Sequence, residues 1–404
     1  NFCNTETSKK SPLKYTKGPK QETMERSLLL FQNSLKSEKS FETYYKNLDL
    51  FRRFIKTDDF DSITRTAHDK LQVLLEDYIM NLKGRISPNT IPTYYFPIQT
   101  FLETNDIDLK WKKIRRLFPA KVKRTGREAW STQDIKTMLG YSINIRNRAL
   151  VLFLASSGIR VGALVDMKIR NLRDMPLGCK AILVYEDSTE EYWTFITPEA
   201  SESLERYIAK RKSDGEHIIP DSPLFRTKYA DGASKVKKLS TKGAYETVVR
   251  ILNTSGLRTQ DVKKKGRFNK MPDHAFRKRF LTILKSNPKI PTSQAEKMVG
   301  HQVYRDEDNN MVMLDSSYNV PTSEVLFNSY KHAITDLTID DYSRVKIKET
   351  EIQKQYSVLD EEKQRHFEEK KKWYKTILDR TRTKGEIPDW LRPVMDEMIQ
   401  DFES

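Results

Sequence analysis

The chain has 404 residues, which is more than one ordinary globular domain needs and predicts two or three domains. Its 72 Lys and Arg residues outnumber 56 Asp and Glu residues, so the net charge of +16 favours an anionic partner, nucleic acid first, over a merely well-solvated surface. Cys3 and Cys179 form neither a metal-binding pair nor a disulfide framework, and no apolar run approaches the ~20 residues of a membrane span. We therefore expect a cytoplasmic protein without a zinc site or a membrane segment.

The first quarter of the chain is predicted to hold an arm and a small helical domain. Residues 1–23 are rich in Ser, Thr and Lys and poor in apolar residues, which predicts a mobile basic arm. Apolar residues then recur at helical spacing in five segments, at about 24–35, 40–55, 70–82, 89–102 and 110–117. Ser40 is expected to cap the second of these helices. Together the five segments predict an all-helical domain over residues 24–117.

A basic linker is predicted over residues 118–128. The segment contains Pro and Gly, shows no hydrophobic period, and carries the cations Lys121, Lys123, Arg124 and Arg127. We expect a second domain over residues 129–340, mainly α-helical with a small β-hairpin or sheet. Beyond it, residues 341–404 are highly charged and predict a long helix and a tail. A partner-binding coiled coil and a solvated helix packed back on the domain are both open.

Local patterns give the second domain its expected elements. Ser131 can cap a helix, and an apolar helix over 147–156 is expected to end at Gly158. The β-rich runs 181–185 and 192–196 flank a polar turn, which predicts the hairpin. Helices are expected to resume at Pro198.

Three short stretches of this domain carry residues suited to phosphate chemistry. Arg160 follows the expected helix end. His274 and Arg277 are three positions apart, so they share one face of a helix. His301 and Tyr318 stand in polar surroundings further along. Each has an ordinary explanation when taken singly: a surface Arg after a helix cap, a basic amphipathic helix, a packed Tyr. The combination is what indicates a site.

In chain order, Arg160, then His274-x-x-Arg277, then Gly300-His301, then Tyr318 resembles the tyrosine recombinase superfamily. The resemblance covers roughly residues 25–340. It implies that the helical first domain is a SAM-like, core-binding DNA-binding domain and that the second has the DNA breaking-rejoining fold of the catalytic domain. The stretch from Thr197 to Glu199 and the segment after Tyr330 look most like archaeal integrases of mobile elements.

The resemblance implies a DNA strand transferase with defined roles for these residues. Arg160 and Arg277 offer permanently charged, bidentate donors to a phosphate that gains negative charge in the transition state. The resemblance makes Tyr318 the nucleophile. A phenol has a reference pKa of about 10, so Tyr318 must lose its proton as it attacks, either to a neighbouring imidazole or to water near the cationic cluster, and His274 is the favoured acceptor. His301 would donate to the phosphate or assist the base. A 3′-phosphotyrosyl link conserves the bond energy, so we expect no cofactor, ATP or metal ion.

The sequence departs from the superfamily pattern near the hairpin. The turn over 186–191 lacks the usual Lys that helps to protonate the leaving oxygen. Thr189 occupies that place. Lys180 is a candidate substitute, although a surface Lys beside a strand is its more ordinary interpretation. The acidic residue often found three positions after the first Arg is replaced by Ala163. Either change would slow or alter the chemistry.

The nucleophile has two competitors. Residues 302–313 resemble an insertion that lengthens the spacing between His301 and Tyr318, which leaves Tyr330 and Tyr304 as rival candidates. Tyr318 is favoured because the surrounding Asp-Ser-Ser-Tyr-Asn resembles the family motif, whereas Tyr330 lies in an apolar-patterned helix where packing is a sufficient role.

The implied partner is a duplex DNA attachment site, bound by a homo-tetramer on the synapsed DNA and near the nucleoid. Besides the linker cations, the basic run over 235–242, with Lys235 and Lys238, is predicted to contact phosphates. We expect site-specific recombination that integrates or excises a mobile element. A type IB topoisomerase, a telomere resolvase and a catalytically inactive DNA-binding relative remain as alternatives.

Overall fold

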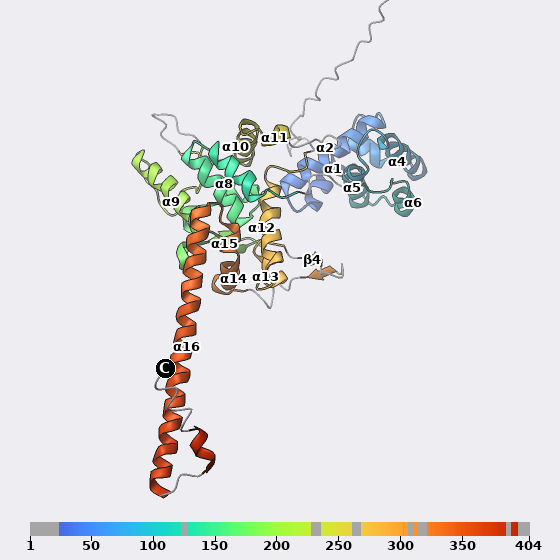
Figure 1. The fold of residues 1–404 in the computed structure, drawn as a ribbon. Coiled ribbons are helices and arrows are strands. Elements are labelled where there is room, and N and C mark those ends of the chain that lie inside the picture. Colours follow the sequence, from blue (N-terminus) through green and yellow to red (C-terminus); the bar gives the residue numbers. More distant parts are fainter. Residues whose placement is uncertain are drawn as a thin grey trace, which may run out of the picture. The chain divides into compact units, whose positions relative to one another are not determined.

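The computed structural model describes residues 24–122, 128–227, 236–260, 268–301, 303–305, 311–313, 321–384 and 389–394. The chain forms two compact units, residues 1–124 and 125–404, whose helices and strands are shown in Figure 1. The predicted arm over 1–23 lies outside the described residues. Helices dominate and the sheets are small, so the predicted mainly α fold class is confirmed.

The first unit is all helical in its described part. Four aromatic side chains, Phe31, Phe51, Tyr95 and Phe101, are fully buried in its core. Phe31 meets Phe101 edge-on, with ring centroids 5.6 Å apart. The four aromatic residues lie on apolar stripes of amphipathic helices, which is why periodicity predicts these helices. The elements are α1 Arg26–Ser34, α2 Glu38–Phe54, α3 Phe60–Thr64, α4 His68–Leu82, η2 Pro88–Thr90, α5 Ile91–Thr104 and α6 Trp111–Arg116.

Two details of this unit differ from the sequence prediction. The N-cap of α2 is Ser37 rather than Ser40, because the Ser37 hydroxyl oxygen accepts the backbone N–H of Ser40 at 3.2 Å. Helix α3 is not predicted by periodicity, since five residues are too few to show it. It begins where the Asp59 carboxylate accepts the N–H of Ser62 at 2.5 Å.

The second unit contains the remaining helices and two small sheets. Its elements are α7 Thr132–Gly140, α8 Ile145–Ser157, η3 Val161–Val165, η4 Ile169–Asn171, β1 Leu172–Asp174, η5 Pro176–Gly178, β2 Lys180–Val184, β3 Tyr192–Ile196, α9 Pro198–Ser213, α10 Thr241–Thr254, α11 Leu257–Gln260, α12 His274–Ser286, α13 Thr292–Lys297, β4 Val303–Arg305, β5 Met311–Met313, α14 Ser323–Tyr330, η6 Lys331–Ala333, α15 Ile334–Leu337, α16 Asp341–Lys384 and η7 Asp389–Leu391. The predicted hairpin and the resumption of helix at Pro198 are both confirmed.

The strands are antiparallel throughout the described residues. β2 pairs with β3, where Ala181 lies opposite Phe195, and β1 adds a third strand that the sequence does not predict. β4 and β5 form a separate two-stranded ladder in which Tyr304 lies opposite Val312. The stretch over 302–313 that resembles an insertion therefore contains a hairpin of its own.

Helix α8 forms the centre of the second unit. Its residues from Ala149 to Ser157 are all buried, as expected for a helix that is apolar on every side. It packs against α9 and α12, and Figure 1 shows α8 beside α12. The predicted cap at Ser131 is also confirmed: its hydroxyl oxygen accepts the N–H of Asp134 at 3.1 Å, and the Asp134 carboxylate accepts the Ser131 N–H at 2.8 Å.

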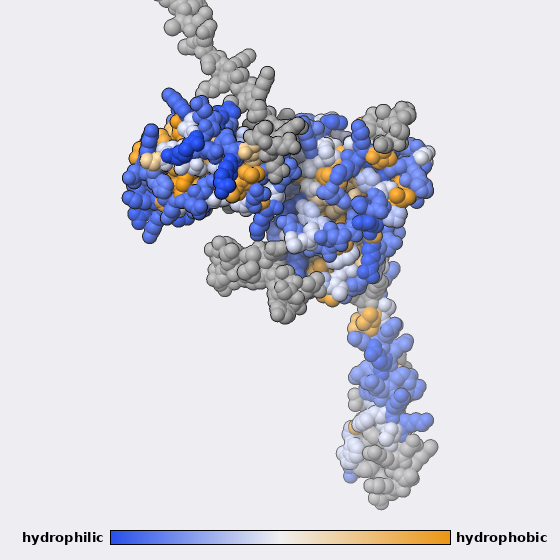
Figure 2. All heavy atoms as spheres, turned by 180° about the vertical axis from the view of Figure 1, so that it is seen from behind, coloured by the Kyte–Doolittle hydropathy of each residue, from blue (hydrophilic) through white to orange (hydrophobic). Residues whose placement is uncertain are grey.

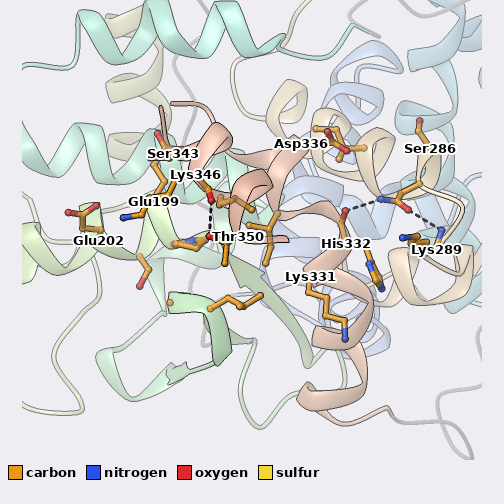
Figure 3. A pocket seen from close by; sticks show the side chains of 18 of the residues that line it. Glu199, Glu202, Ser286, Lys289, Lys331, His332, Asp336, Ser343, Lys346 and Thr350 are labelled. Carbon is orange, nitrogen blue, oxygen red and sulfur yellow. Dashed lines mark hydrogen bonds between the residues drawn. The ribbon is translucent and has the colours of Figure 1, made fainter. Parts of the chain in front are cut away.

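The predicted charged helix after residue 340 is present as α16, and Figure 2 shows a mostly hydrophilic surface along it on the face drawn. The partly buried Glu199 carboxylate accepts the backbone N–H groups of Ile339 and Asp340, at 2.7 and 3.2 Å, just before the helix starts. A hollow of about 1230 Å³ lies beside this connection, lined by α9, the end of α12 and the first turns of α16 (Figure 3).

Candidate active site

Arg160 is placed by the turn that ends α8. Gly158 adopts a left-handed conformation with φ +60°, and its N–H donates to the Leu154 carbonyl at 3.2 Å. A Cβ atom at Gly158 would lie 2.5 Å from the ring of Phe280 on α12, so only glycine allows this close packing. The predicted end of the helix at Gly158 is thereby confirmed. Arg160 follows two residues later and is partly exposed.

Arg277 joins this turn to a second one. Its side chain is only 7 % exposed. One guanidinium nitrogen, Nη1, donates to the Gly158 carbonyl at 3.0 Å, and Nη2 donates to the Val299 carbonyl. A guanidinium has five N–H donors, so these two bonds leave donors for a further anionic group. The Arg277 side chain thus fixes the turn before Arg160 and the turn before His301 relative to each other.

The second turn places His301. Gly300 has φ +64°, its N–H donates to the Lys297 carbonyl at 2.9 Å, and the His301 N–H donates to the Glu296 carbonyl at 3.1 Å. These two bonds form a Schellman motif at the end of α13. A Cβ atom at Gly300 would lie 2.5 Å from the ring of Tyr192, so the turn rests directly on this aromatic side chain.

His274 is the first residue of α12 and is exposed. Partial burial lowers its pKa, and the positive charges of Lys278, Arg277 and Arg160 lower it further. A neutral imidazole beside two guanidiniums can accept a proton at neutral pH. Burial likewise lowers the pKa of Arg277, with a contribution from Arg160. The positive charge of Arg160 thus acts on both His274 and Arg277.

Two residues of this site escape prediction from sequence. Burial raises the pKa of Tyr192, and the positive charges of Arg277 and Arg160 partly offset this effect. Glu296 is 2 % exposed, and its carboxylate lies 2.5 Å from Nδ1 of His301 and pairs with Lys285. No spacing or composition distinguishes either residue from an ordinary strand Tyr or surface Glu, because both roles depend on long-range packing.

Of the three candidate nucleophiles, only Tyr330 has its side chain among the described residues. Tyr318 lies outside the described residues, and the side chain of Tyr304 also does, although its backbone belongs to β4. Tyr330 is fully buried, its hydroxyl donates to the Ser156 carbonyl at 3.2 Å, and burial raises its pKa well above the usual range. Its ring packs against Phe195 with centroids 5.1 Å apart. The buried ring and the bonded hydroxyl of Tyr330 are those of a core residue.

The two candidates for the missing hairpin Lys lie in the hairpin itself: Lys180 begins β2, the central strand of the three-stranded sheet, and Thr189 lies in the turn that follows β2. The Lys180 amine forms ion pairs with Asp174 at 2.5 Å and Glu205 at 2.8 Å. Thr189 is exposed in the turn between β2 and β3. Lys180 is the first residue of β2 and its side chain is 14 % exposed, so it is less exposed than the interpretation as a surface Lys beside a strand predicts.

The predicted DNA contacts are only partly described. Lys121 is exposed, and Lys238 is 56 % exposed and forms an ion pair with Asp166 at 2.7 Å. The other four cations, Lys123, Arg124, Arg127 and Lys235, lie outside the described residues.

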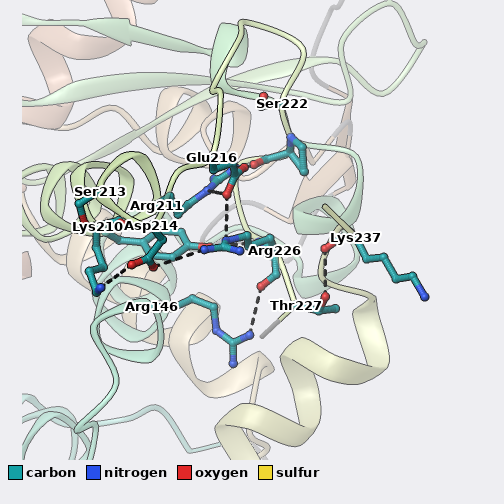
Figure 4. Close-up of polar contacts among 12 residues, drawn as sticks. Arg146, Lys210, Arg211, Ser213, Asp214, Glu216, Ser222, Arg226, Thr227 and Lys237 are labelled. Atoms are coloured by element: carbon teal, nitrogen blue, oxygen red, sulfur yellow. Dashed lines mark hydrogen bonds and ion pairs between the residues drawn. The ribbon is translucent and has the colours of Figure 1, made fainter. Parts of the chain in front are cut away.

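A buried ion network supports the backbone next to Lys238. Figure 4 shows Glu216 held between Arg211 and Arg226, with its carboxylate 3.0 Å from Nε of each Arg. The Arg226 carbonyl in turn accepts Nη1 of Arg146 at 3.1 Å. Because Arg226 pairs with Lys238 in a β-bridge, this network fixes the start of the segment that leads to Lys238.

Among the described residues, no group of three or more His, Cys, Asp or Glu side chains could hold a metal ion. None of the described helices is both long and apolar enough to cross a membrane.

Comparison with known proteins identifies the region that holds this site. Residues 130–307 match the Phage integrase family. The Tyrosine recombinase XerC of Lactobacillus delbrueckii subsp. bulgaricus is 28% identical over 119 residues, and that of Lactobacillus leichmannii is 28% identical over the same length. These alignments span 29% of this chain and 37% of each relative, so the chain covers little more than a third of the relatives' length.

Solved structures with a similar chain path include two integrases on DNA. A lambda integrase dimer bound to a COC′ core site is 15% identical, with a TM-score of 0.46 over 69% of this chain and 93% of that chain. The Tn1549 transposon integrase in complex with transposon right end DNA is 12% identical, with a TM-score of 0.49 over 68% of this chain and 91% of that chain. The likeness of the second unit to integrases therefore rests on the match over residues 130–307 and on its Arg and His residues.

Proposed function

We propose that this protein is a site-specific recombinase that cleaves and rejoins duplex DNA, in keeping with the match of residues 130–307 to the Phage integrase family. The observation that carries the proposal is the double anchorage of Arg277 on the Gly158 and Val299 carbonyls. It holds Arg160 and His301 on two rigid turns around one buried guanidinium, a preorganised arrangement of donors for a phosphate.

The proposed reaction is an in-line displacement at phosphorus. The Tyr318 oxygen forms a bond to the scissile phosphorus while the bond to the 5′-oxygen breaks, which leaves a 3′-phosphotyrosyl link and a 5′-hydroxyl. Arg160 and Arg277 stabilise the charge that develops on the non-bridging oxygens. His274 accepts the phenol proton, in keeping with its lowered pKa. Attack by a second 5′-hydroxyl reverses the step, so the exchange conserves one phosphodiester bond and needs no ATP or metal ion.

The choice of Tyr318 over Tyr330 is supported by the packing of the rival. A nucleophilic phenol must reach the phosphorus, whereas the Tyr330 hydroxyl is buried and bonded to the Ser156 carbonyl. Moving it to the surface would break this bond and open a cavity between α8, β3 and α14. Tyr318 therefore stays the proposed nucleophile.

The proposed partner is duplex DNA carrying the attachment site of a mobile element, bound by four copies of the chain when two sites are paired. The net charge of +16 supports an anionic partner, and the resemblance to archaeal integrases supports integration or excision. The linker cations and the segment ending at Lys238 are the proposed phosphate contacts.

A covalent trapping experiment tests the chemistry and the nucleophile together. The full chain is incubated with a nicked suicide substrate carrying the element's own end sequence, beside the variants Tyr318→Phe, Tyr330→Phe and Tyr304→Phe. We expect a protein–DNA adduct from the wild type and from the Tyr330 and Tyr304 variants, and none from Tyr318→Phe. An adduct from Tyr318→Phe would refute the assignment. Absence of any adduct from the wild type would indicate an inactive DNA-binding relative.

A second assay separates recombinase from its closest alternatives. Two plasmids that each carry the attachment site should recombine, while a supercoiled plasmid without the site should stay supercoiled. Relaxation of the plasmid without a site would indicate a type IB topoisomerase. Hairpin-ended products would indicate a telomere resolvase.

A further inference from the structure

We propose that Glu296 is a positioning residue that fixes the imidazole of His301 with its proton on Nδ1, so that Nε2 is the ring nitrogen available to the DNA. The inference rests on the proposed function for the role of His301 in DNA cleavage. The contact itself is a property of the protein alone, and it can be tested without DNA.

The contacts of the Glu296 carboxylate stabilise its ionised form. It is 2 % exposed, and both its oxygens are engaged: Oε2 lies 2.5 Å from Nδ1 of His301, and Oε1 pairs with the Lys285 amine. Burial acts to raise the pKa of Glu296, but the bonds to His301 and Lys285 outweigh it and the pKa is lowered. The buried carboxylate is therefore ionised at neutral pH.

Ionisation of Glu296 determines the tautomer of His301. An ionised carboxylate can only accept hydrogen bonds. The short contact to Nδ1 therefore requires a proton on Nδ1, and in a neutral ring Nε2 then carries the lone pair. A partner on one ring nitrogen is the usual way in which proteins fix the working form of the other. His301 can then offer Nε2 as an acceptor, or as a donor once it is protonated.

The same pair is also joined through the backbone. The His301 N–H donates to the Glu296 carbonyl at 3.1 Å, in the Schellman motif that Gly300 closes against Tyr192. The ring of His301 is thus held at its own backbone and at Nδ1 by one residue. The Lys285 amine pairs with the other carboxylate oxygen of Glu296, Oε1, so Lys285 provides a matched control for the contact between Oε2 and the ring.

The test is ¹⁵N NMR of the full chain labelled in its histidine rings, with the resonance of His301 identified by the variant His301→Gln. In the wild type we expect a protonated Nδ1 and an unprotonated Nε2 at pH 7.5 to 8. Glu296→Ala should move the ring towards the Nε2–H tautomer, whereas Lys285→Met should leave it unchanged. A wild-type ring with its proton on Nε2 would overturn the proposal even if no variant folds, and so would an unchanged ring in Glu296→Ala.

Cleavage measurements separate this proposal from the proposed function. In a single-turnover assay on the suicide substrate, Glu296→Ala should slow adduct formation by about 10- to 100-fold, and Lys285→Met by no more than about 3-fold. If the wild type forms no adduct, the proposed function fails, while the NMR result still decides the role of Glu296. If Lys285→Met slows the reaction as much as Glu296→Ala with an unchanged ring, the pair is structural and the positioning role is wrong.

Discussion

Gly158 and Gly300 lie at the two turns that Arg277 holds together. At both positions the backbone conformation and the neighbouring ring leave no room for a side chain. Each has a positive φ, and each backs directly onto an aromatic ring. The rings belong to Phe280 and Tyr192, which place α12 and β3 against the turns. The close approach of backbone to ring therefore helps to place the Gly158 and Val299 carbonyls where Arg277 binds them.

Replacing Gly158 by Ala should reduce the free energy of unfolding by about 2–4 kcal/mol, because the left-handed conformation and the contact with Phe280 at 2.5 Å both penalise a methyl group. Gly215→Ala is the matched control: it also has positive φ, but nothing lies within 4 Å of its Cβ position. It should cost about 1 kcal/mol. Urea unfolding of the two variants tests this, and equal losses would show that the Phe280 contact is unimportant.

Asp273, next to His274, should make stability fall as pH rises. Its Oδ1 is buried without a hydrogen-bond partner among the described residues, and burial raises its pKa to about 6. Because the folded state holds this proton more tightly than the unfolded state, the stabilisation is complete below about pH 4 and is lost as pH passes 6. Asp273→Asn removes the effect.

The difference in stability between Asp273→Asn and the wild type should therefore grow between pH 4 and pH 7, by at most about 3 kcal/mol. Melting temperatures measured at intervals from pH 4 to pH 8 give the two curves. Parallel curves over this range would mean that the Asp273 carboxyl is solvated or paired in solution.

At the scale of elements, the buried network of Arg211, Glu216 and Arg226 fixes α9 against the segment that follows it. The Arg211 guanidinium also donates to the Pro223 and Leu224 carbonyls, both at 2.9 Å. The Glu216 carboxylate contacts both buried guanidiniums, and Asp214 adds a longer pair to Arg226 at 3.6 Å, so removal of the Glu216 charge is expected to be destabilising.

Glu216→Gln should lower the free energy of unfolding by about 3–5 kcal/mol, since it leaves the buried Arg211 guanidinium without its counter-ion and Arg226 with the more distant Asp214 carboxylate at 3.6 Å. Lys242→Ala, which breaks an exposed pair with Glu246 at 3.7 Å on α10, should cost less than about 1 kcal/mol. Both are measured by urea unfolding of the full chain. A loss below 1 kcal/mol in Glu216→Gln would show that water reaches the network.

The length of a helix or strand decides whether the sequence predicts it. Long amphipathic helices such as α2 and α4, and the all-apolar α8, have periods that can be recognised directly. Helix α3 and strand β1 are too short for any period, and they exist because tertiary contacts and caps hold them. The candidate site likewise contains residues that a local motif predicts and residues that only tertiary packing places. The motif around His274 and Arg277 is local, whereas Glu296 and Tyr192 take their roles from packing that joins distant segments.

On the scale of the whole molecule, positive charge is spread over both units, and proposed phosphate contacts should be visible in the salt dependence of DNA binding. Lys238→Gln should weaken binding and reduce the slope of log K against log salt by about one. Lys210→Gln is a matched control, since Lys210 is 58 % exposed and paired with Asp214, much as Lys238 is 56 % exposed and paired with Asp166. An unchanged slope in Lys238→Gln would remove it from the interface.

The two units have separate hydrophobic cores. All buried apolar residues of the first core lie between Leu28 and Ile114, while those of the other two clusters lie between Trp130 and Ile339. No core residue is shared, so each unit has what it needs to fold alone. The predicted linker over 118–128 falls between the two sets of core residues.

Limited digestion with trypsin should therefore cut first within 118–128, where four cations are predicted to lie in a linker, and should leave two fragments that resist further cleavage. Each fragment should unfold cooperatively, because its core is intact. The larger fragment keeps Arg160, Arg277 and Tyr318 but lacks the first unit. If the first unit supplies binding and the second supplies chemistry, this fragment should still form the covalent adduct at high DNA concentration, with a much weaker apparent affinity. Aggregation of either fragment would show that the two cores depend on each other.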